Sequence, residues 1–499
     1  MNSFDIVSAL EYNARTFPDK PAFIEPEGRS FSWSETRDAA MSVAAALASA
    51  GRRRDLPVAV TVGRDASCVA AILGCIAAGR WYVPIDGELP PERMKMMIGV
   101  ADPELIVSSL PGASAHGLPV IDPSSLPAAG NYLPSPASGD EPLFGIFTSG
   151  STGTPKLVVK SSRAMTSFIA EFIGEFGFSP NEVFGNQIPF FFDASTKDLF
   201  ATVALGAACV IIPQKEFSFP VNLVSILNKY KVTSVVWVPS ALSIAARFNV
   251  FSAALPETLA NILFVGEQMP VKYLNVWMNA LPGAEFVNLY GSTEVAGNSC
   301  FYRVPRGLPD DAILPVGRPF NGIRVFLAGP DGTDADEGEI AVAGPWLANG
   351  YWRDPEKTAS VFRDCEIGGF SGRVYFSGDF GRRNPDGTLV CVSRKDSQIK
   401  HMGHRIELGE IEAAAVAMPY VRECCCVYNP SSEKIILVFS CDAGPDRQKQ
   451  LRSDLSRVLP KYMIPHVFRE LPELPHNRNG KIDRAALKLT YAPGSPSNR

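Results

Sequence analysis

A short run of small and hydroxyl-bearing residues, from Thr148 to Lys156, is the first candidate for chemistry in this 499-residue chain. It contains three Thr, two Ser, two Gly and one Lys, and it follows the apolar run 143–147, which predicts a buried strand. Backbone N–H groups and hydroxyls in such a loop can surround a polyphosphate, while the lysine neutralises part of its charge. The glycine spacing and Pro155 distinguish it from a Walker P-loop. The alternative is an ordinary polar connection between a strand and a helix.

Strands and helices alternate on both sides of this loop, which predicts parallel sheets of the α/β class. Before the loop we expect strands at 56–62, 81–85 and 104–108, and helices at 66–78 and 91–100. After it we expect helices at 162–176, 199–206 and 221–230, and strands at 208–212, 234–238, 262–265 and 286–289. Ligands bind beyond the carboxyl ends of parallel strands, and polar, Gly-containing turns follow three predicted strands: 143–147, 262–265 and 286–289.

The character of the chain changes from about Pro315. The tight turns Pro330-Asp331-Gly332 and Pro385-Asp386-Gly387 indicate an antiparallel, barrel-like piece, and shorter segments follow Lys395. We therefore predict an α/β protein with a large N-terminal domain of layered sheets and a β-barrel-like subdomain, residues 1–395. A small, mobile α+β domain, residues 396–499, would complete the fold.

Composition narrows the class of protein. A formal net charge of −5 gives no reason to expect a nucleic-acid or membrane partner. The N-terminus has no basic segment followed by an apolar one, and the longest apolar runs are too short to cross a bilayer. The ten cysteines are interpreted as reduced core residues. We expect a cytoplasmic protein.

Several separated motifs together resemble the adenylate-forming superfamily, which includes acyl- and aryl-CoA ligases, luciferases and the amino-acid adenylation domains of nonribosomal peptide synthesis. The resemblance runs from Tyr82-Val83-Pro84-Ile85-Asp86 to Asn479-Gly480-Lys481-Ile482-Asp483-Arg484, essentially the whole chain. It is strongest to stand-alone amino-acid adenylating enzymes such as D-alanine–carrier-protein ligases. It implies that ATP and a carboxylic acid react to give an acyl-AMP and pyrophosphate.

The resemblance assigns the nucleotide to residues from several motifs. The opening loop would close over the β- and γ-phosphates through Thr148, Ser149, Gly150, Ser151, Thr152, Gly153 and Lys156. In the block 288–294, Asn288 would meet the adenine edge, Tyr290 would stack on the ring, and Thr293 would bond the α-phosphate, with Gly291 and Ser292 beside them. Glu294 would hold Mg²⁺, a hard cation suited to a carboxylate and phosphate oxygens. Taken alone, Glu294 would be read as a solvated turn acid.

Later motifs supply the ribose site, the hinge and the catalytic cation. Asp379, in Ser377-Gly378-Asp379, would accept both ribose hydroxyls, with Arg394 nearby and Asp396 as the hinge. Lys481 would stabilise the charge that develops when the substrate carboxylate attacks the α-phosphate, although most lysines are simply exposed. The sequence departs from the family pattern at Leu157, Cys391 and Ser393, where Gly, an aromatic residue and Gly are usual.

Asp193, in Phe192-Asp193-Ala194-Ser195, bears on the substrate. In family members that take amino acids, an Asp at this site pairs with the α-ammonium, whereas CoA ligases for fatty and aryl acids usually lack it. An unpaired carboxylate at an apolar boundary is costly, so Asp193 is expected to need a cation. The alternative is that Asp193 caps the helix that follows.

By resemblance, the remaining pocket would be lined by Ala194, Lys197, Trp237, Leu263, Val265, Leu289, Gly297 and Asn298. Trp237 would shorten the pocket, and Lys197 would favour an acidic or polar substrate group if it points inward rather than into solvent. We therefore expect a small or acidic amino acid.

The acyl group would then pass to the phosphopantetheine thiol of a separate carrier protein, or to CoA, after the small domain rotates about Asp396. Two alternatives remain open. One is a CoA ligase for a small carboxylic acid, and the other is a catalytically silent homologue that acts as a binding protein.

Overall fold

The computed structural model describes residues 4–50, 54–110, 116–150, 154–394, 398–476 and 482–492. The chain divides into two compact units. The first comprises Met1–Gly87, Ala101–Phe147 and Leu157–Lys395, and the second comprises Glu88–Val100, Thr148–Lys156 and Asp396–Arg499. Each unit has a hydrophobic core of its own.

A nine-stranded sheet forms the centre of the first unit, and six neighbouring strands in it run parallel. Those six, in spatial order, are β13 (Glu285–Tyr290), β12 (Asn261–Val265), β11 (Ser234–Trp237), β9 (Val183–Asn186), β10 (Ala208–Ile211) and β1 (Pro21–Ile24). Antiparallel strands complete the two edges: β14 (Cys300–Arg303) and β15 (Arg318–Pro319) on one side, and β2 (Phe31–Ser32) on the other. The short apolar runs after the loop are therefore central, parallel strands, as predicted.

A second sheet has seven strands and contains the run that precedes the opening loop. Its order is β18 (Gly350–Tyr351), β8 (Lys156–Ser161), β7 (Pro142–Thr148), β4 (Tyr82–Asp86), β3 (Val58–Val62), β5 (Leu105–Val107) and β6 (Val120–Ile121). The loop thus joins strand β7 to strand β8. The alternative of a connection between a strand and a helix is wrong, because β8 comes before the next helix.

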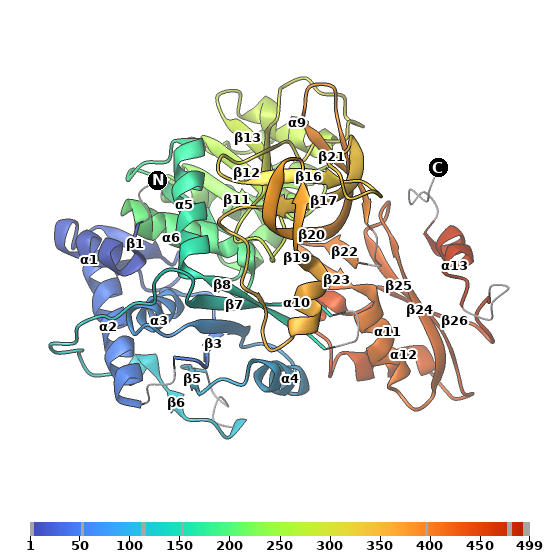
Figure 1. The fold of residues 1–499 in the computed structure, drawn as a ribbon, viewed down its shortest axis with the longest axis horizontal. Helices are drawn as coiled ribbons and strands as arrows, with labels where there is room; N and C mark the ends of the chain where they lie inside the picture. The colour runs from blue at the N-terminus through green and yellow to red at the C-terminus, as the bar shows by residue number, and fades with distance from the viewer. Residues whose placement is uncertain are drawn as a thin grey trace. The chain divides into compact units, whose positions relative to one another are not determined.

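Helix α5 shows how capping residues set the ends of a helix in the first unit. In α5 (Ser162–Phe176), the Ser161 side chain accepts from the Ala164 N–H, and Gly177 follows in the left-handed conformation with φ 64°. Figure 1 shows α5 beside α6 (Thr196–Leu205), with which it is in contact. The other helices are α1 (Ile6–Thr16), α2 (Trp33–Ala50), α3 (Ala66–Ala77), α7 (Pro220–Lys229), α8 (Pro239–Arg247), α9 (Val271–Ala280) and α10 (Pro355–Val361).

An antiparallel five-stranded sheet ends the first unit and matches the barrel-like subdomain predicted from the tight turns (Figure 1). Its strands are β16 (Arg324–Ala328), β17 (Glu337–Ala343), β20 (Phe370–Arg383), β19 (Phe362–Ile367) and β21 (Leu389–Arg394). Because β20 is 14 residues long, it pairs with three strands and fixes Asp379 opposite Arg394 of β21.

The second unit is a small α+β structure. It contains most of α4 (Pro91–Ala101), the hairpin of β22 (Gln398–His401) and β23 (His404–Glu407), and a three-stranded sheet of β24 (Val421–Asn429), β25 (Lys434–Cys441) and β26 (Val467–Glu470). Its remaining helices are α11 (Leu408–Val416), α12 (Arg447–Leu455) and α13 (Arg484–Tyr491). Within β24, Cys424 and Cys426 enter one apolar cluster and Cys425 enters another, because successive side chains in a strand alternate faces.

The predicted α/β class, with layered sheets, a barrel-like piece and a small C-terminal α+β part, is confirmed. Among the residues described, none of the helices combines the length and the apolarity that crossing a bilayer needs.

We predict that Phe168→Ala lowers the free energy of unfolding by about 3–5 kcal/mol, because it leaves a large cavity. The Phe168 ring is fully buried in α5, with ring centroids of Phe172, Phe320 and Trp346 at 5.7, 6.0 and 6.0 Å. Denaturant titration of both proteins measures the change. The control is Phe248→Ala, at a residue 67% exposed, with an expected change within about 0.5 kcal/mol. Equal losses in the two variants would contradict this packing.

Candidate active site

A buried lysine interacts with two of the carboxylates assigned above. Lys160, in β8, is completely buried, and its ammonium forms an ion pair with Oδ1 of Asp193. Glu294 also acts on it electrostatically and accepts a hydrogen bond from the Tyr351 hydroxyl at 2.7 Å. Burial lowers the pKa of Lys160, while Asp193 and Glu294 raise it. Asp193, which is expected to bind the substrate, and Glu294, which is expected to bind the metal, are therefore coupled through one internal cation.

The sequence predicts that Asp193 needs a cation, and the resemblance points to the substrate's α-ammonium, but the structure shows that the protein itself already provides one. Lys160 supplies that cation through Oδ1, whereas Oδ2 accepts no hydrogen bond within the described ranges. The helix-cap alternative is also wrong, because α6 has Ser195 at its N-cap and receives no side-chain capping bond. Asp193 instead opens the 3₁₀ turn Asp193–Ser195, and Oδ2 has lone pairs for a donor on a bound molecule.

Sequence reasoning missed Lys160, although a signal was present. It follows Leu157, Val158 and Val159 in an apolar run that the structure buries as β8. A lysine inside a buried strand needs a paired anion, since an unpaired internal charge is costly. Nothing in the linear sequence indicates that the anion is Asp193, 33 residues away.

Lys197 is buried in the first turn of α6 and is only 1% exposed, so it does not extend into solvent. The neighbouring Asp198 is buried too, and its Oδ2 accepts from the Asn186 side-chain amide at 3.0 Å. Burial lowers the pKa of Lys197 to about 8 and raises the pKa of Asp198 to about 7. Burial also lowers the pKa of Arg64, which acts on Asp198, to about 10. Lys197, Asp198 and Arg64 are therefore buried charged groups near the start of α6, and Asp198 interacts electrostatically with the other two.

The apolar residues assigned to the pocket do not all share one face of the sheet. Leu263 and Val265 point the same way from β12, and Leu289 of β13 is paired in register with Val265. Trp237 is paired with Phe264, the residue between them, so its side chain leaves the opposite face. The Trp237 indole N–H donates to the Gly185 carbonyl at 2.7 Å. This packing gives no support to the expectation that Trp237 shortens the pocket.

The turn after β13 is shaped by two glycines. Gly297 has φ 92°, and a Cβ built there would lie 2.2 Å from the Phe168 ring. A Cβ on Gly291 would lie 2.7 Å from the Gly297 carbonyl oxygen. Asn298 follows, 1% exposed, and its Oδ1 has no hydrogen-bond partner in the part of the chain that the structure describes. The turn therefore presents buried polar groups on a tightly constrained backbone.

Three residues assigned to the nucleoside come together from three strands. The Tyr290 hydroxyl of β13 donates to Asp379 Oδ2 of β20 at 2.5 Å, and Arg394 of β21 pairs with Oδ1 of the same carboxylate. Burial raises the pKa of Tyr290 well above its ordinary value, so its hydroxyl stays a donor. Asn288 is anchored by its amide to the Pro315 carbonyl at 2.8 Å. Each Asp379 oxygen keeps a second lone pair that can accept a ribose hydroxyl.

In the second unit, the opening loop is bonded to the hairpin β22–β23 and to α11. Ser149 Oγ donates to the Arg405 carbonyl at 2.9 Å and accepts from the Glu407 N–H at 3.1 Å. The Gly150 N–H donates to Glu410 Oε2 at 3.2 Å. Glu410 is 1% exposed, and its Oε1 lies 2.5 Å from Arg93 of α4. A backbone N–H of the loop thus already binds an anionic oxygen, which is the kind of group a phosphate presents.

Gly150 is required by the loop's own backbone. A Cβ at this residue would lie 1.9 Å from the Thr154 carbonyl oxygen, so the loop closes on a space that only glycine leaves open. Thr148 is buried at the end of β7, and the Lys156 ammonium lies 4.0 Å from Glu407 Oε1. The assigned residues Ser151, Thr152, Gly153, Asp396 and Lys481 lie outside the described residues.

The protein side chains could hold a magnesium ion only together with phosphate oxygens of a bound nucleotide. Among described residues, no group of three or more His, Cys, Asp or Glu side chains could hold a metal. Glu294 supplies one buried carboxylate, and Mg²⁺ commonly takes one or two carboxylates together with phosphate oxygens and waters.

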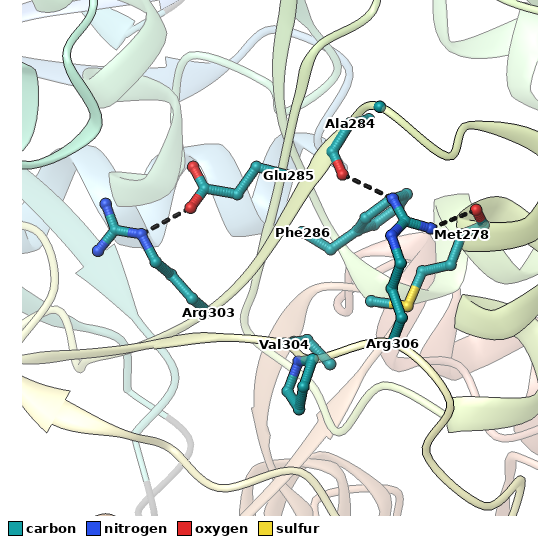
Figure 2. Close-up of a pocket in the computed structure, with 9 residues that line it drawn as sticks. Met278, Ala284, Glu285, Phe286, Arg303, Val304 and Arg306 are labelled. Carbon is teal, nitrogen blue, oxygen red and sulfur yellow. Dashed lines mark hydrogen bonds and ion pairs between the residues drawn. The ribbon is translucent and has the colours of Figure 1, made fainter.

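A separate hollow lies at the amino end of β13 and is shown in Figure 2. Arg306 there donates to the carbonyls of Met278, Leu281 and Ala284 at 2.5–2.9 Å, and Arg303 pairs with Glu285. Both guanidinium groups therefore already bond to protein groups. The hollow lies at the end of β13 opposite Tyr290. We assign no ligand to it.

We predict that Lys160→Met lowers the free energy of unfolding by about 3–5 kcal/mol, because it leaves Asp193 without its internal cation. The double variant Lys160→Met/Asp193→Asn should recover most of this loss, and a double-mutant cycle from urea titrations measures the coupling. Lys215→Met is the matched control, since its ion pair with Glu27 is 58% exposed on both sides and its loss should leave the free energy of unfolding nearly unchanged. Purely additive effects at 160 and 193 would refute the pair.

Comparison with known proteins agrees with this arrangement. A family model described as AMP-binding enzyme matches residues 10–352, and one described as AMP-binding enzyme C-terminal domain matches residues 410–481. The chain is 32% identical to the L-proline–[L-prolyl-carrier protein] ligase of Streptomyces coelicolor, over 95% of this chain and 94% of that protein.

Other relatives are much longer or are known by structure. Tyrocidine synthase 3 of Brevibacillus parabrevis is 30% identical over 94% of this chain, which spans only 7% of that protein. The crystal structure of IdnL1 superposes with a TM-score of 0.78 at 28% identity, covering 94% of this chain and 98% of that one. This chain therefore belongs to the AMP-binding enzyme family.

Proposed function

We propose that this protein is a ligase that activates an amino acid with ATP, forming an aminoacyl-AMP and pyrophosphate. It then transfers the aminoacyl group to the phosphopantetheine thiol of a separate carrier protein. The observation that carries this proposal is the end-to-end similarity to a proline–carrier protein ligase, of which this chain covers 94%.

Asp193 is proposed to bind the substrate's ammonium through Oδ2. Its Oδ1 stays on Lys160, so the carboxylate is held in one orientation before any substrate arrives. Pre-orientation of this kind lowers the entropic cost of binding. The apolar residues Leu263, Val265 and Leu289, which share one face of the sheet, are proposed to contact the substrate side chain.

For the nucleotide, Asp379 is proposed to accept the ribose hydroxyls while Tyr290 and Arg394 hold it in place. Asn288 is proposed to lie at the adenine edge, with Tyr290 beside the ring and Ser292 and Thr293 near the α-phosphate. Glu294 is the proposed protein ligand of Mg²⁺. The bound ion would neutralise phosphate charge.

The proposed catalytic cation is Lys481, where the substrate carboxylate and the α-phosphate bring two anions together. The boundaries 1–395 and 396–499, with Asp396 as the hinge between them, are likewise proposals.

The test is ATP–pyrophosphate exchange with the purified protein across L-, D- and β-amino acids, compared with the matching hydroxy and unsubstituted acids. The proposal expects exchange only with substrates that carry an amino group, since without it Asp193 Oδ2 would have no hydrogen-bond donor in the complex. Exchange that is equally fast with acids lacking the amine, followed by transfer to CoA, would identify a CoA ligase instead. Failure of every acid to exchange would indicate a silent homologue.

We predict that Lys481→Ala lowers the exchange rate by about 100-fold or more, because it removes the cation that stabilises the transition state. The matched control is Lys488→Ala in α13, an exposed lysine in the same unit, which should exchange at the wild-type rate. ATP binding measured by calorimetry should persist in both variants. Wild-type exchange by Lys481→Ala would remove this residue from the mechanism.

A further inference from the structure

The carboxylate proposed to bind the ribose stands in an irregular part of its strand. After the pair Glu339–Phe380, the next two residues of β17 span four residues of β20. The extra residues fall in Ser377-Gly378-Asp379, so the segment that carries Asp379 is a β-bulge. A bulge bends its strand and changes the direction of its side chains. The direction of the Asp379 carboxylate therefore depends on the contacts that hold the bulge.

Hydrogen bonds to the neighbouring strand β17 hold this bulge. Gly378 is in the left-handed conformation with φ 76°, and its N–H donates to Glu339 Oε1 at 2.9 Å. The Ser377 hydroxyl donates to the Ile340 carbonyl at 2.7 Å and accepts from the Asp379 N–H at 3.1 Å. A bond from a backbone N–H to a carboxylate is charge-assisted and therefore among the stronger hydrogen bonds. Glu339 thus fixes the residue directly before Asp379.

Glu339 bonds to the backbone beside Asp379 rather than to its carboxylate. The carboxylate oxygens have other partners, because Oδ2 accepts from Tyr290 and Oδ1 pairs with Arg394. Those two residues hold the end of the Asp379 side chain, whereas the bulge sets where the backbone places it. Both must agree if the remaining lone pairs are to meet two ribose hydroxyls, since hydrogen bonds weaken steeply as their angles depart from linearity.

We propose that Glu339 is a positioning residue of the nucleotide site: by holding the Gly378 N–H, it directs Asp379 toward both ribose hydroxyls. This inference rests on the nucleotide part of the proposed function, because it assumes that the ribose binds at Asp379. Glu339 and Gly378 are 39 residues apart, so their bond follows from the pairing of β17 with β20 and from no local motif.

The experiment measures the binding of ATP, 2′-deoxy-ATP and 3′-deoxy-ATP to the full-length protein by calorimetry, with magnesium present. For the wild type we expect a Kd for ATP at least about tenfold below the Kd of either deoxynucleotide, since each lacks one hydrogen bond to a charged group. Glu339→Met removes the acceptor of the Gly378 N–H and should reduce this preference to about threefold or less. The loss should fall mainly on ATP, because the deoxynucleotides have fewer ribose bonds to lose.

Two conservative variants separate the hydrogen bond from the charge. Glu339→Gln keeps an acceptor oxygen at the same reach and should keep most of the preference for ATP. Glu339→Asp keeps the charge but is shorter by a methylene group, so it should lose the preference as Glu339→Met does. If Glu339→Met does not fold, this pair of variants decides the question.

Glu337→Met is the matched control. Glu337 lies two residues away on the same face of β17, is exposed, and bonds to no other residue in the part of the chain that the structure describes. This variant should bind all three nucleotides as the wild type does. A role of Glu339 in stability alone would weaken the three nucleotides alike and leave the ratio of their Kd values unchanged.

The inference is overturned if the wild type does not prefer ATP, if Glu339→Met keeps the wild-type ratio, or if Glu339→Gln loses the preference while Glu339→Asp keeps it. The proposed function is tested separately by pyrophosphate exchange. A ribose preference that depends on Glu339, in a protein that exchanges with no amino acid, would support the inference and contradict amino-acid activation. Exchange without that preference would do the reverse.

Discussion

The ion pair between Lys160 and Asp193 is the interaction on which the rest of the site depends. It joins the seven-stranded sheet, through β8, to the turn that starts α6 beside the nine-stranded sheet. A buried pair of this kind is seldom a net source of stability, because both ions lose hydration. Its role here is positional: Lys160 fixes the orientation of the Asp193 side chain, and Glu294 is coupled to the same ammonium. The residues proposed to bind substrate and metal are thereby both coupled to one internal cation.

Around this pair, rigid strands bring together residues that are far apart in sequence. Tyr290 and Asp379 are 89 residues apart, yet they are joined by a hydrogen bond between β13 and β20. Arg394 reaches the same carboxylate because β20 and β21 pair in register. In the second unit, by contrast, Glu410 occupies a backbone N–H of the loop that is proposed to bind phosphate. A phosphate would have to compete with this carboxylate for that donor.

Most of the fold could be predicted from the sequence, because its strands are short, apolar and separated by helices. The helix 162–176 was predicted with the bounds that α5 has, helped by Ser161 and Gly177 at its ends. The helices α8 and α9 were missed; Val238, at the N-cap of α8, and Pro270, at the N-cap of α9, provide no side-chain cap. Strand β8 was missed as well, because Lys160 interrupts its apolar pattern.

The resemblance indicated candidate residues but not how they are bonded. It pointed to Asp193, Tyr290, Asp379 and Arg394, since their order along the chain is recognisable, and the structure joins the last three by a hydrogen bond and an ion pair. It could not reveal that Asp193 is bonded to Lys160, or that Lys197 points inward, because both facts depend on long-range packing. The direction of Trp237 likewise follows from strand register, which a single sequence does not determine.

The most direct test is a crystal structure of the full-length protein with a non-hydrolysable aminoacyl-adenylate analogue. The account predicts that the analogue's amine lies within about 3.2 Å of Asp193 Oδ2, while Lys160 remains paired with Oδ1. A complex in which the amine binds away from Asp193, or in which Lys160 leaves Asp193, would contradict it.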